Sequence, residues 1–286
     1  MRYIKIYPNS GAVQTALDAQ ELGKPYMVFI EDEHRIDWNS LGGEPEPPVY
    51  SAMPLTIEAI SALTITFKEA TAGPTLYRSY TYSVNGGDWI ETNTSAKTEI
   101  ILSAGDTVQF KGNNLTYASG ESGSRYCMFS VVRPSDTNFI VYGNIMSLID
   151  SENFATLTQF PGGTYNFKNL FTGEGNLKDA SNLILPATSL TTGCYSNMFR
   201  GCDGLVTAPE LPARTLTASS YYSMFYVCTS LRSIRCLATD ISARSCVYDW
   251  LGGVSQTGTF VKYPDAVWPT GNNGIPTGWT VIDADI

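Results

Sequence analysis

Two neighbouring stretches of this sequence are similar to each other: "YSNMFRGCDGLVTAPELPARTL", residues 195–216, and "YYSMFYVCTSLRSIRCLATDI", residues 221–241. Apolar residues of the first stretch recur 26 positions later in the second. This constant offset indicates a structural repeat, in which each copy is too small to bury its own apolar side chains and stacks on its neighbours. The paired positions are Met198 with Met224, Phe199 with Phe225, Cys202 with Cys228, Leu205 with Leu231 and Leu211 with Leu237.

Further copies lie on both sides of this pair. In the earlier copy, "FKNLFTGEGNLKDASNLILPATSL", Phe171 precedes Phe199 by 28 residues, whereas Leu185 precedes Leu211 by 26, which indicates a two-residue insertion near "SNLI". A degraded copy follows, with Trp250 26 residues after Met224, and ends in "WPTGNNGIPTGW". A period of 20 to 29 residues with leucines at fixed offsets is typical of leucine-rich solenoids, so we expect residues 141–286 to form one.

The segments before the repeats predict two further parts. Residues 46–140 alternate apolar and polar residues between turn signals such as Asn85-Gly86-Gly87, which predicts hairpins in a small antiparallel, immunoglobulin-like β-sandwich. Residues 1–45 contain two short strand patterns, "YIKIY" and "YMVFI", around a segment with helical spacing, and end near the linker "GGEPEPPVY". The expected fold is therefore mainly β, with a small N-terminal α/β segment, a sandwich and a C-terminal solenoid.

The composition excludes several classes of partner. The 18 Lys and Arg residues against 27 Asp and Glu residues give a net charge of −9, which would repel nucleic acid and anionic membranes. No stretch approaches the roughly 18 apolar residues of a membrane span, and the N-terminus has no signal-peptide core, so we expect no membrane insertion. Six cysteines without a C-x-x-C pair are expected to be buried thiols, although disulfides remain an alternative.

The residues of catalysis and metal binding are sparse. His34 is the only histidine, and the acidic residues around it lack the ligand spacing of a calcium loop. Glu210 has no second carboxylate at the matching position of the next copy, which argues against a glycosidase pair. We therefore expect no enzyme activity, no catalytic residue, no cofactor and no metal. Four tyrosines of the repeats could instead stack on sugars or on a partner protein, although burial within the repeat is the more common role: Tyr221, Tyr222, Tyr226 and Tyr248.

The phrases "NMFRGCDGLVTAPELPARTL", "SMFYVCTSLRSI" and "WLGGVSQTGTFVKYPDAVWPTGNNGIPTGW" resemble the BspA-like leucine-rich repeats of surface proteins from Bacteroides and related gut bacteria. The resemblance covers about residues 145–280. The stretches "YSVNGGDWIE" and "SAGDTVQFKGNN" are also similar to the domain that often precedes such repeats. The resemblance implies an adhesive protein displayed on a surface.

The stretch "SGAVQTALDAQELGKPYMVFIEDEHRIDWNSL", residues 10–41, resembles the leader of structural proteins from phages that infect Bacteroides, including crAss-like phages. Together with the missing export signal, this resemblance favours a head fibre or capsid decoration protein on the virion surface, made in the host cytoplasm. Its expected partners are other capsid or tail proteins, further copies of itself in a homo-oligomer such as a trimer, and a host-surface protein or glycan. The residues expected to anchor it to the virion are Tyr3, Ile4, Tyr7, Leu17, Tyr26, Phe29 and Ile36.

Two other functions stay open. A bacterial cell-surface adhesin of the same repeat family would carry an export signal upstream of Met1. A tail-associated receptor-binding protein would have the same leader docked to the phage tail. A third reading, a carbohydrate-active enzyme, has no support in the sequence, because it would need carboxylates paired across one face of the solenoid.

Overall fold

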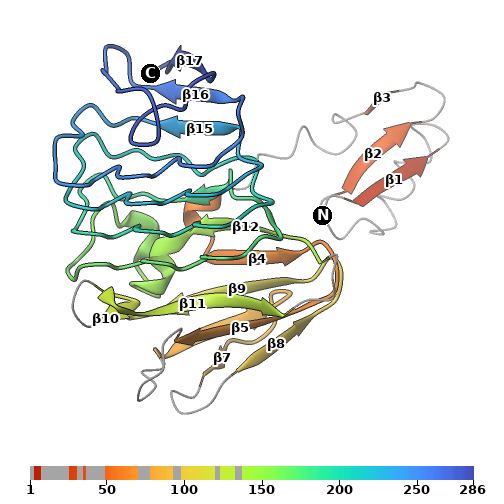
Figure 1. The fold of residues 1–286 in the computed structure, drawn as a ribbon. Helices are drawn as coiled ribbons and strands as arrows, with labels where there is room; N and C mark the ends of the chain where they lie inside the picture. The colour runs from red at the N-terminus through yellow and green to blue at the C-terminus, as the bar shows by residue number, and fades with distance from the viewer. Residues whose placement is uncertain are drawn as a thin grey trace. The chain divides into compact units, whose positions relative to one another are not determined.

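The computed structural model describes residues 3–7, 26–30, 35–36, 49–69, 78–92, 98–119, 123–132 and 137–286. The fold is mainly β with almost no helix, as expected from the sequence. The chain divides into two compact units, Met1–Val49 and Tyr50–Ile286. Figure 1 labels most of the strands of both.

The first unit contains a three-stranded sheet. Strand β1 (Tyr3–Tyr7) pairs in parallel with β2 (Tyr26–Ile30), and β2 pairs antiparallel with β3 (Arg35–Ile36). The two strands expected from "YIKIY" and "YMVFI" are thereby confirmed. The helical pattern between them lies outside the described residues.

The second unit begins with two β-sheets packed face to face. One sheet has the order β10-β11-β5-β8, and the other joins β12-β4-β9-β6-β7 to the first strand of the repeats, β13 (Leu177–Asp179). The ring of Phe110 on β9 contacts Phe129 on β11 edge-on, with centroids 4.9 Å apart, so the two sheets share an aromatic core. The strands are β4 (Leu55–Ala59), β5 (Leu63–Glu69), β6 (Tyr80–Val84), β7 (Ile90–Glu91), β8 (Glu99–Leu102), β9 (Thr107–Gly112), β10 (Ala118–Ser119), β11 (Arg125–Val132) and β12 (Phe139–Asn144).

The hairpin expected at Asn85-Gly86 is present. Both residues have positive φ, 53° and 71°. A tight hairpin turn of this kind needs positive φ at both central residues, and Asn and Gly tolerate that conformation best. Strands β6 and β7 pair antiparallel after this turn, with Tyr82 opposite Ile90. The turn sequence alone was therefore enough to locate this element.

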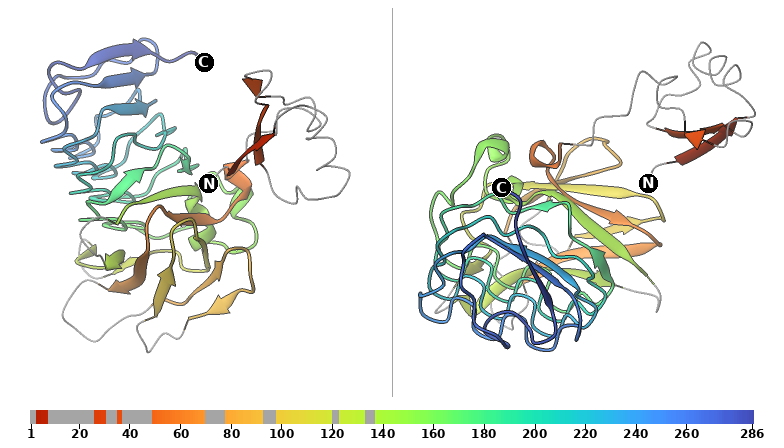
Figure 2. Two further views of the ribbon diagram at one scale, coloured as in Figure 1. Left: turned by 90° about the vertical axis from the view of Figure 1, so that its right-hand side faces the viewer. Right: turned by 90° about the horizontal axis from the view of Figure 1, so that it is seen from above.

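The repeats form successive coils that lie on one another, visible from two directions in Figure 2. Each coil contains a segment of consecutive turns and a short extended segment; the turn segments are 165–174, 193–202, 219–228 and 245–254. The extended segments of the last coils pair in parallel, in the order β15-β16-β17. The strands of this region are β13 (Leu177–Asp179), β14 (Leu183–Ile184), β15 (Ser233–Cys236), β16 (Thr259–Lys262) and β17 (Thr280–Asp283).

Backbone hydrogen bonds in the turn segments alternate between two directions. The N–H of Met198 donates to Tyr195 within its own coil, whereas the N–H of Phe199 donates to the carbonyl of Met224 in the next coil, at 2.9 Å. Bonds between the later coils join residues 25 apart, while those from the first coil to the second join residues 27 apart, such as Phe171 to Met198. This two-residue difference agrees with the insertion inferred from the sequence.

Every fourth residue of the turn segments has positive φ. The third such position in each coil is Gly173, Gly201, Val227 and Gly253, with φ between 53° and 76°. A β-branched residue such as Val227 rarely adopts this conformation, so its presence shows that the cross-coil bonds impose the backbone geometry.

We predict that Gly201→Val lowers the free energy of unfolding by about 1–3 kcal/mol, because the added side chain disfavours the left-handed backbone. The new Cβ itself has room, since its nearest neighbour would be 3.6 Å away. Gly162→Val is the matched control: its φ lies outside the left-handed region, its Cβ would be 3.8 Å from the nearest atom, and it should cost under about 0.5 kcal/mol. Urea denaturation measures both, and equal losses would contradict the explanation.

The first coil has no coil before it, and the β-sandwich takes that place by making the same backbone hydrogen bonds. The N–H groups of Tyr117 and Phe129 donate to the carbonyls of Asn166 and Leu170, both at 2.8 Å. The equivalent carbonyls in the second coil, those of Cys194 and Met198, lie 28 residues later and accept from N–H groups of the first coil in the same way. Strand β12 adds parallel pairing with β13 and β14. Strand β12 is thus shared by both regions, because it also pairs antiparallel with β4 of the sandwich.

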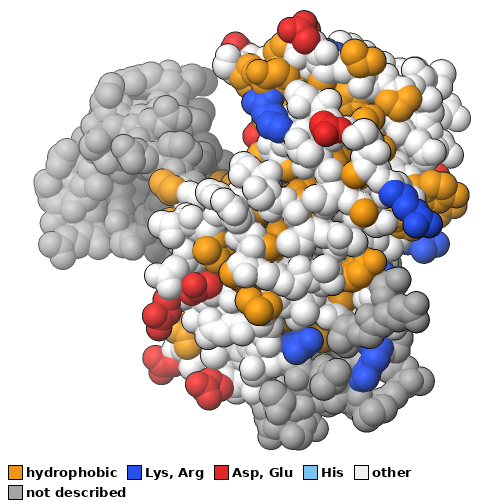
Figure 3. All heavy atoms as spheres, turned by 90° about the vertical axis from the view of Figure 1, so that its left-hand side faces the viewer, with side chains coloured by type: hydrophobic (Ala, Val, Ile, Leu, Met, Phe, Trp, Pro, Cys, Tyr) orange, Lys and Arg blue, Asp and Glu red, His pale blue; other side chains and the backbone are white. Residues whose placement is uncertain are grey.

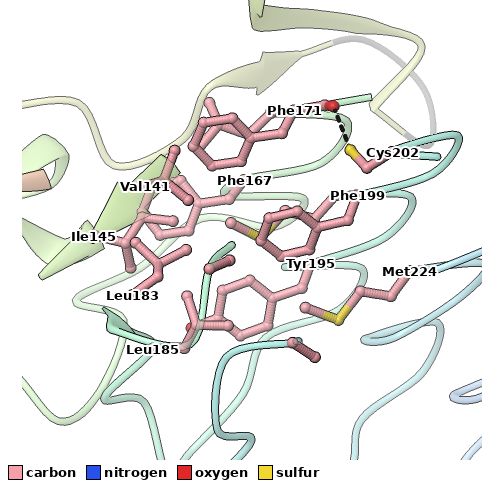
Figure 4. Packing of buried hydrophobic residues seen from close by; sticks show 14 of the residues in the cluster. Val141, Ile145, Phe167, Phe171, Leu183, Leu185, Tyr195, Phe199, Cys202 and Met224 are labelled. Atoms are coloured by element: carbon pink, nitrogen blue, oxygen red, sulfur yellow. Dashed lines mark hydrogen bonds between the residues drawn. The ribbon is translucent and has the colours of Figure 1, made fainter. Parts of the chain in front are cut away.

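Two aromatic columns cross this junction. The rings of Phe129, Phe171, Phe199 and Phe225 stack in sequence with centroids 5.3 to 5.5 Å apart. Tyr117 begins a second column, whose members are about 6 Å apart and lie in the interior: Phe167, Tyr195, Tyr221 and Trp250. Figure 4 shows part of this packing. The sandwich and the coils therefore share one continuous core.

Candidate functional site

Outward side chains of the turn segments form two pairs on the coils, one of two stacked tyrosines and one of an arginine with a tyrosine. The rings of Tyr222 and Tyr248 stack with centroids 5.1 Å apart and planes 15° from parallel. The guanidinium of Arg200 lies 5.2 Å from the centroid of the Tyr226 ring. We call Arg200, Tyr222, Tyr226 and Tyr248 the tyrosine strip. Its members come from three successive coils, and the repeat offset of 26 residues brings Arg200 next to Tyr226 and Tyr222 next to Tyr248.

The exposure of the tyrosine strip suits contact with a partner. Tyr248 is half exposed, and Tyr222 and Tyr226 are partly buried against their neighbours. A held ring with one free face is a good platform for a sugar or an apolar side chain, and a guanidinium can stack there as well. Lys and Arg side chains stay separated on the face drawn in Figure 3, rather than forming one basic patch.

The prediction that Tyr221 is a surface-binding residue is wrong. Its side chain is 1% exposed and occupies the interior column between Tyr195 and Trp250. Tyr221 and Tyr222 are neighbours in the sequence, but only the second points outward. Arg200 was missed because it aligns with a tyrosine rather than with a residue of its own kind, although the offset of 26 could have revealed it.

The residues expected to act as an anchor fall on the first unit. Tyr3 lies opposite Tyr26 in the β1–β2 register, and Phe29 lies opposite Ile36 in the β2–β3 register. Ile4 and Tyr7 are also on β1, so six of the seven residues lie on one small sheet. Leu17 lies outside the described residues.

Groups that could support catalysis or metal binding are not brought together in the described part of the chain. His34 and its acidic neighbours lie outside it. The described residues contain no group of three or more His, Cys, Asp or Glu side chains that could hold a metal ion. Glu210 forms an ion pair with Arg235, with 3.0 Å between Oε2 and Nε.

The six cysteines are all buried and form no disulfide, in agreement with the expectation from the sequence. The thiol of Cys202 donates to the carbonyl of Phe171 at 3.1 Å (Figure 4), and Cys228 bonds to Phe199 in the same way at 3.0 Å. Burial raises the pKa of Cys194, Cys228 and Cys236 to about 12. The thiolate, which is the reactive form, is therefore scarce in the folded protein.

We predict that a thiol reagent at pH 8 labels none of the cysteines in the native chain and all six after unfolding in denaturant. Because folding raises the pKa of Cys194, Cys228 and Cys236 from 9.0 to about 12, the contribution of these thiols to stability is fully present below about pH 9 and is lost as the pH rises toward 12. Counting labelled thiols by mass spectrometry tests burial directly. Rapid labelling of Cys202 or Cys228 in the native chain would contradict the structure.

Comparison of the chain with protein-family models, with curated proteins and with solved structures finds no match. In the described part of the chain, no helix has the length and apolar character needed to span a bilayer. The candidate site therefore rests on the geometry of the coils themselves.

Proposed function

We propose that this protein is a virion structural protein, a head fibre or capsid decoration protein, that binds the host surface through its repeats. In this proposal, residues 1–45 attach to a capsid or tail protein, the sandwich is an immunoglobulin-like spacer, and the coils are a BspA-like leucine-rich-repeat solenoid. Homo-oligomers, such as trimers, would present several copies together and strengthen weak adhesion.

The observation that carries the adhesive part of the proposal is the tyrosine strip. Stacked, partly exposed aromatic rings on a rigid repeat offer contact area at little entropic cost. The virion part is supported by the resemblance of residues 10–41 to phage leaders and by the separate N-terminal unit. A bacterial surface adhesin would use the same strip, so location distinguishes the two.

Immunogold labelling with antibody against residues 145–286 tests the location. We expect gold on the capsid of purified phage particles and none on uninfected host cells. A chain lacking residues 1–45 should fail to enter particles, because its anchor is gone. Label confined to the envelopes of uninfected cells would replace the virion proposal with the bacterial adhesin, and label on the tail would favour the receptor-binding alternative.

Substitution in the tyrosine strip tests adhesion. Tyr248→Ser removes the exposed ring that stacks on Tyr222, and we expect binding of the fluorescent chain to host cells to weaken about tenfold. Tyr126→Ser, which changes a partly exposed tyrosine of the sandwich, is the matched control and should bind as the wild type does. Equal binding by both variants would remove the strip from the proposed function.

A further inference from the structure

A hollow of about 440 Å³ lies beside the last two strands, β16 and β17. The residues that line it follow those of the tyrosine strip in the sequence. Lys262 on β16 and Val281 on β17 form one side, and the segment from Ala266 to Gly278 contributes most of the rest. Small-molecule sites commonly have volumes of about 300–1,000 Å³, with mostly apolar walls and a few polar groups. The hollow matches this description in size and in the nature of its walls.

The aromatic wall of the hollow is held rigidly. One face of the Trp268 ring packs on Trp250, with centroids 5.3 Å apart and planes 17° from parallel, and its edge meets Phe260 at 5.2 Å. Trp250 is fixed in turn, because its indole N–H donates to the carbonyl of Gly274 at 2.9 Å. A ligand that packs on Trp268 would therefore meet a preformed surface, which lowers the entropic cost of binding.

Three of the side chains that line the hollow are polar and can form hydrogen bonds: Lys262, Thr270 and Thr277. Lys262 also forms an ion pair at 2.5 Å with Asp283, which is not a lining residue; the two side chains are 18% and 60% exposed. An ammonium can donate to a neutral polar ligand, and hydroxyl groups can both donate to it and accept from it.

The indole N–H of Trp268 differs from those of its neighbours. The N–H groups of Trp250 and Trp279 donate to backbone carbonyls, at 2.9 Å and 2.8 Å, whereas that of Trp268 is buried with no hydrogen-bond partner in the described part of the chain. A buried donor without an acceptor costs about 1–3 kcal/mol. Because this N–H is shielded from solvent, a ligand in the hollow would contact the ring of Trp268 and not its N–H.

We propose that the hollow binds a neutral pyranose sugar. A pyranose has an apolar C–H face that can pack on Trp268 and a rim of hydroxyl groups that can bond with Lys262, Thr270 and Thr277. A purely aliphatic ligand would make no hydrogen bond with these polar side chains. A phosphorylated or acidic ligand would bring negative charge to Asp283 and to a chain whose net charge is −9. The sugar deepens the proposed adhesive function and rests on that function for its biological role.

Saturation-transfer NMR on the full-length chain tests the site. The probes are the methyl glycosides of glucose, galactose and mannose, together with N-acetylglucosamine and glucose 6-phosphate. We expect transfer to at least one neutral sugar, with the strongest signals from protons of its C–H face, and none to the phosphate. No transfer to any neutral probe, or transfer to the phosphate alone, would overturn the proposal.

Two substitutions locate the binding. Trp268→Phe keeps an aromatic ring but removes part of the stacking area, and it should weaken binding about tenfold. Trp89→Phe is the matched control, because Trp89 is also partly exposed beside a lysine, Lys111, yet lies in the sandwich; it should leave binding unchanged. If Trp268→Phe lowers the melting temperature, Lys262→Met replaces it as the test variant and should show a comparable loss.

Wild-type affinity in both Trp268→Phe and Lys262→Met would refute the site. Immunogold labelling of particles does not depend on sugar binding, so a failed site and a failed virion assignment give distinguishable results.

Discussion

The hydrogen bonds between successive coils are the constraint on which the rest of the structure depends. Alternate N–H groups of each turn segment donate to the next coil, as Phe199 does to Met224. This alternation requires a left-handed residue at every fourth position, and the sequence meets the need with Gly, Asn, Ser or Asp at most of them. A coil at either end of the stack has backbone N–H or carbonyl groups that face no further coil. At one end, the β-sandwich bonds to these carbonyls through the N–H groups of Tyr117 and Phe129.

This arrangement divides the side chains of the coils into inward and outward positions, which have different roles. Inward positions hold the Phe, Tyr, Leu and Cys columns, where a change leaves a cavity or a buried polar group. Outward positions only need to tolerate solvent, so they are where a binding surface can vary without loss of the fold. Tyr222, Tyr226 and Tyr248 are in the second class, and Tyr221 is in the first.

Part of this structure could be predicted from residue spacing. Local and periodic signals, which a sequence displays directly, predict the offset of 26, the burial of Cys202 and Cys228, and the Asn85-Gly86 hairpin. They do not predict the shape of the turn segments. Tyr195, Met198, Phe199 and Cys202 have the spacing i, i+3, i+4, i+7 of an amphipathic helix, yet positive φ at Asn197 and Gly201 makes them consecutive turns.

The shared core and the hollow were also beyond prediction. The match between Tyr117 and Phe167, or Phe129 and Phe171, joins residues about 40 to 50 apart with no repeated motif between them, so tertiary pairing alone reveals it. The hollow beside Trp268 depends on where the chain turns after β16, which Gly and Pro residues permit but do not specify.

The most direct test of this account is amide hydrogen exchange on the full chain, residue by residue. If the sandwich is the terminal coil of the stack, the amides of Tyr117 and Phe129 should open with the same free energy as that of Phe199, within about 1 kcal/mol. Much easier opening of Tyr117 and Phe129, with Phe199 still protected, would show that the sandwich and the coils are separate cooperative units and would contradict the account.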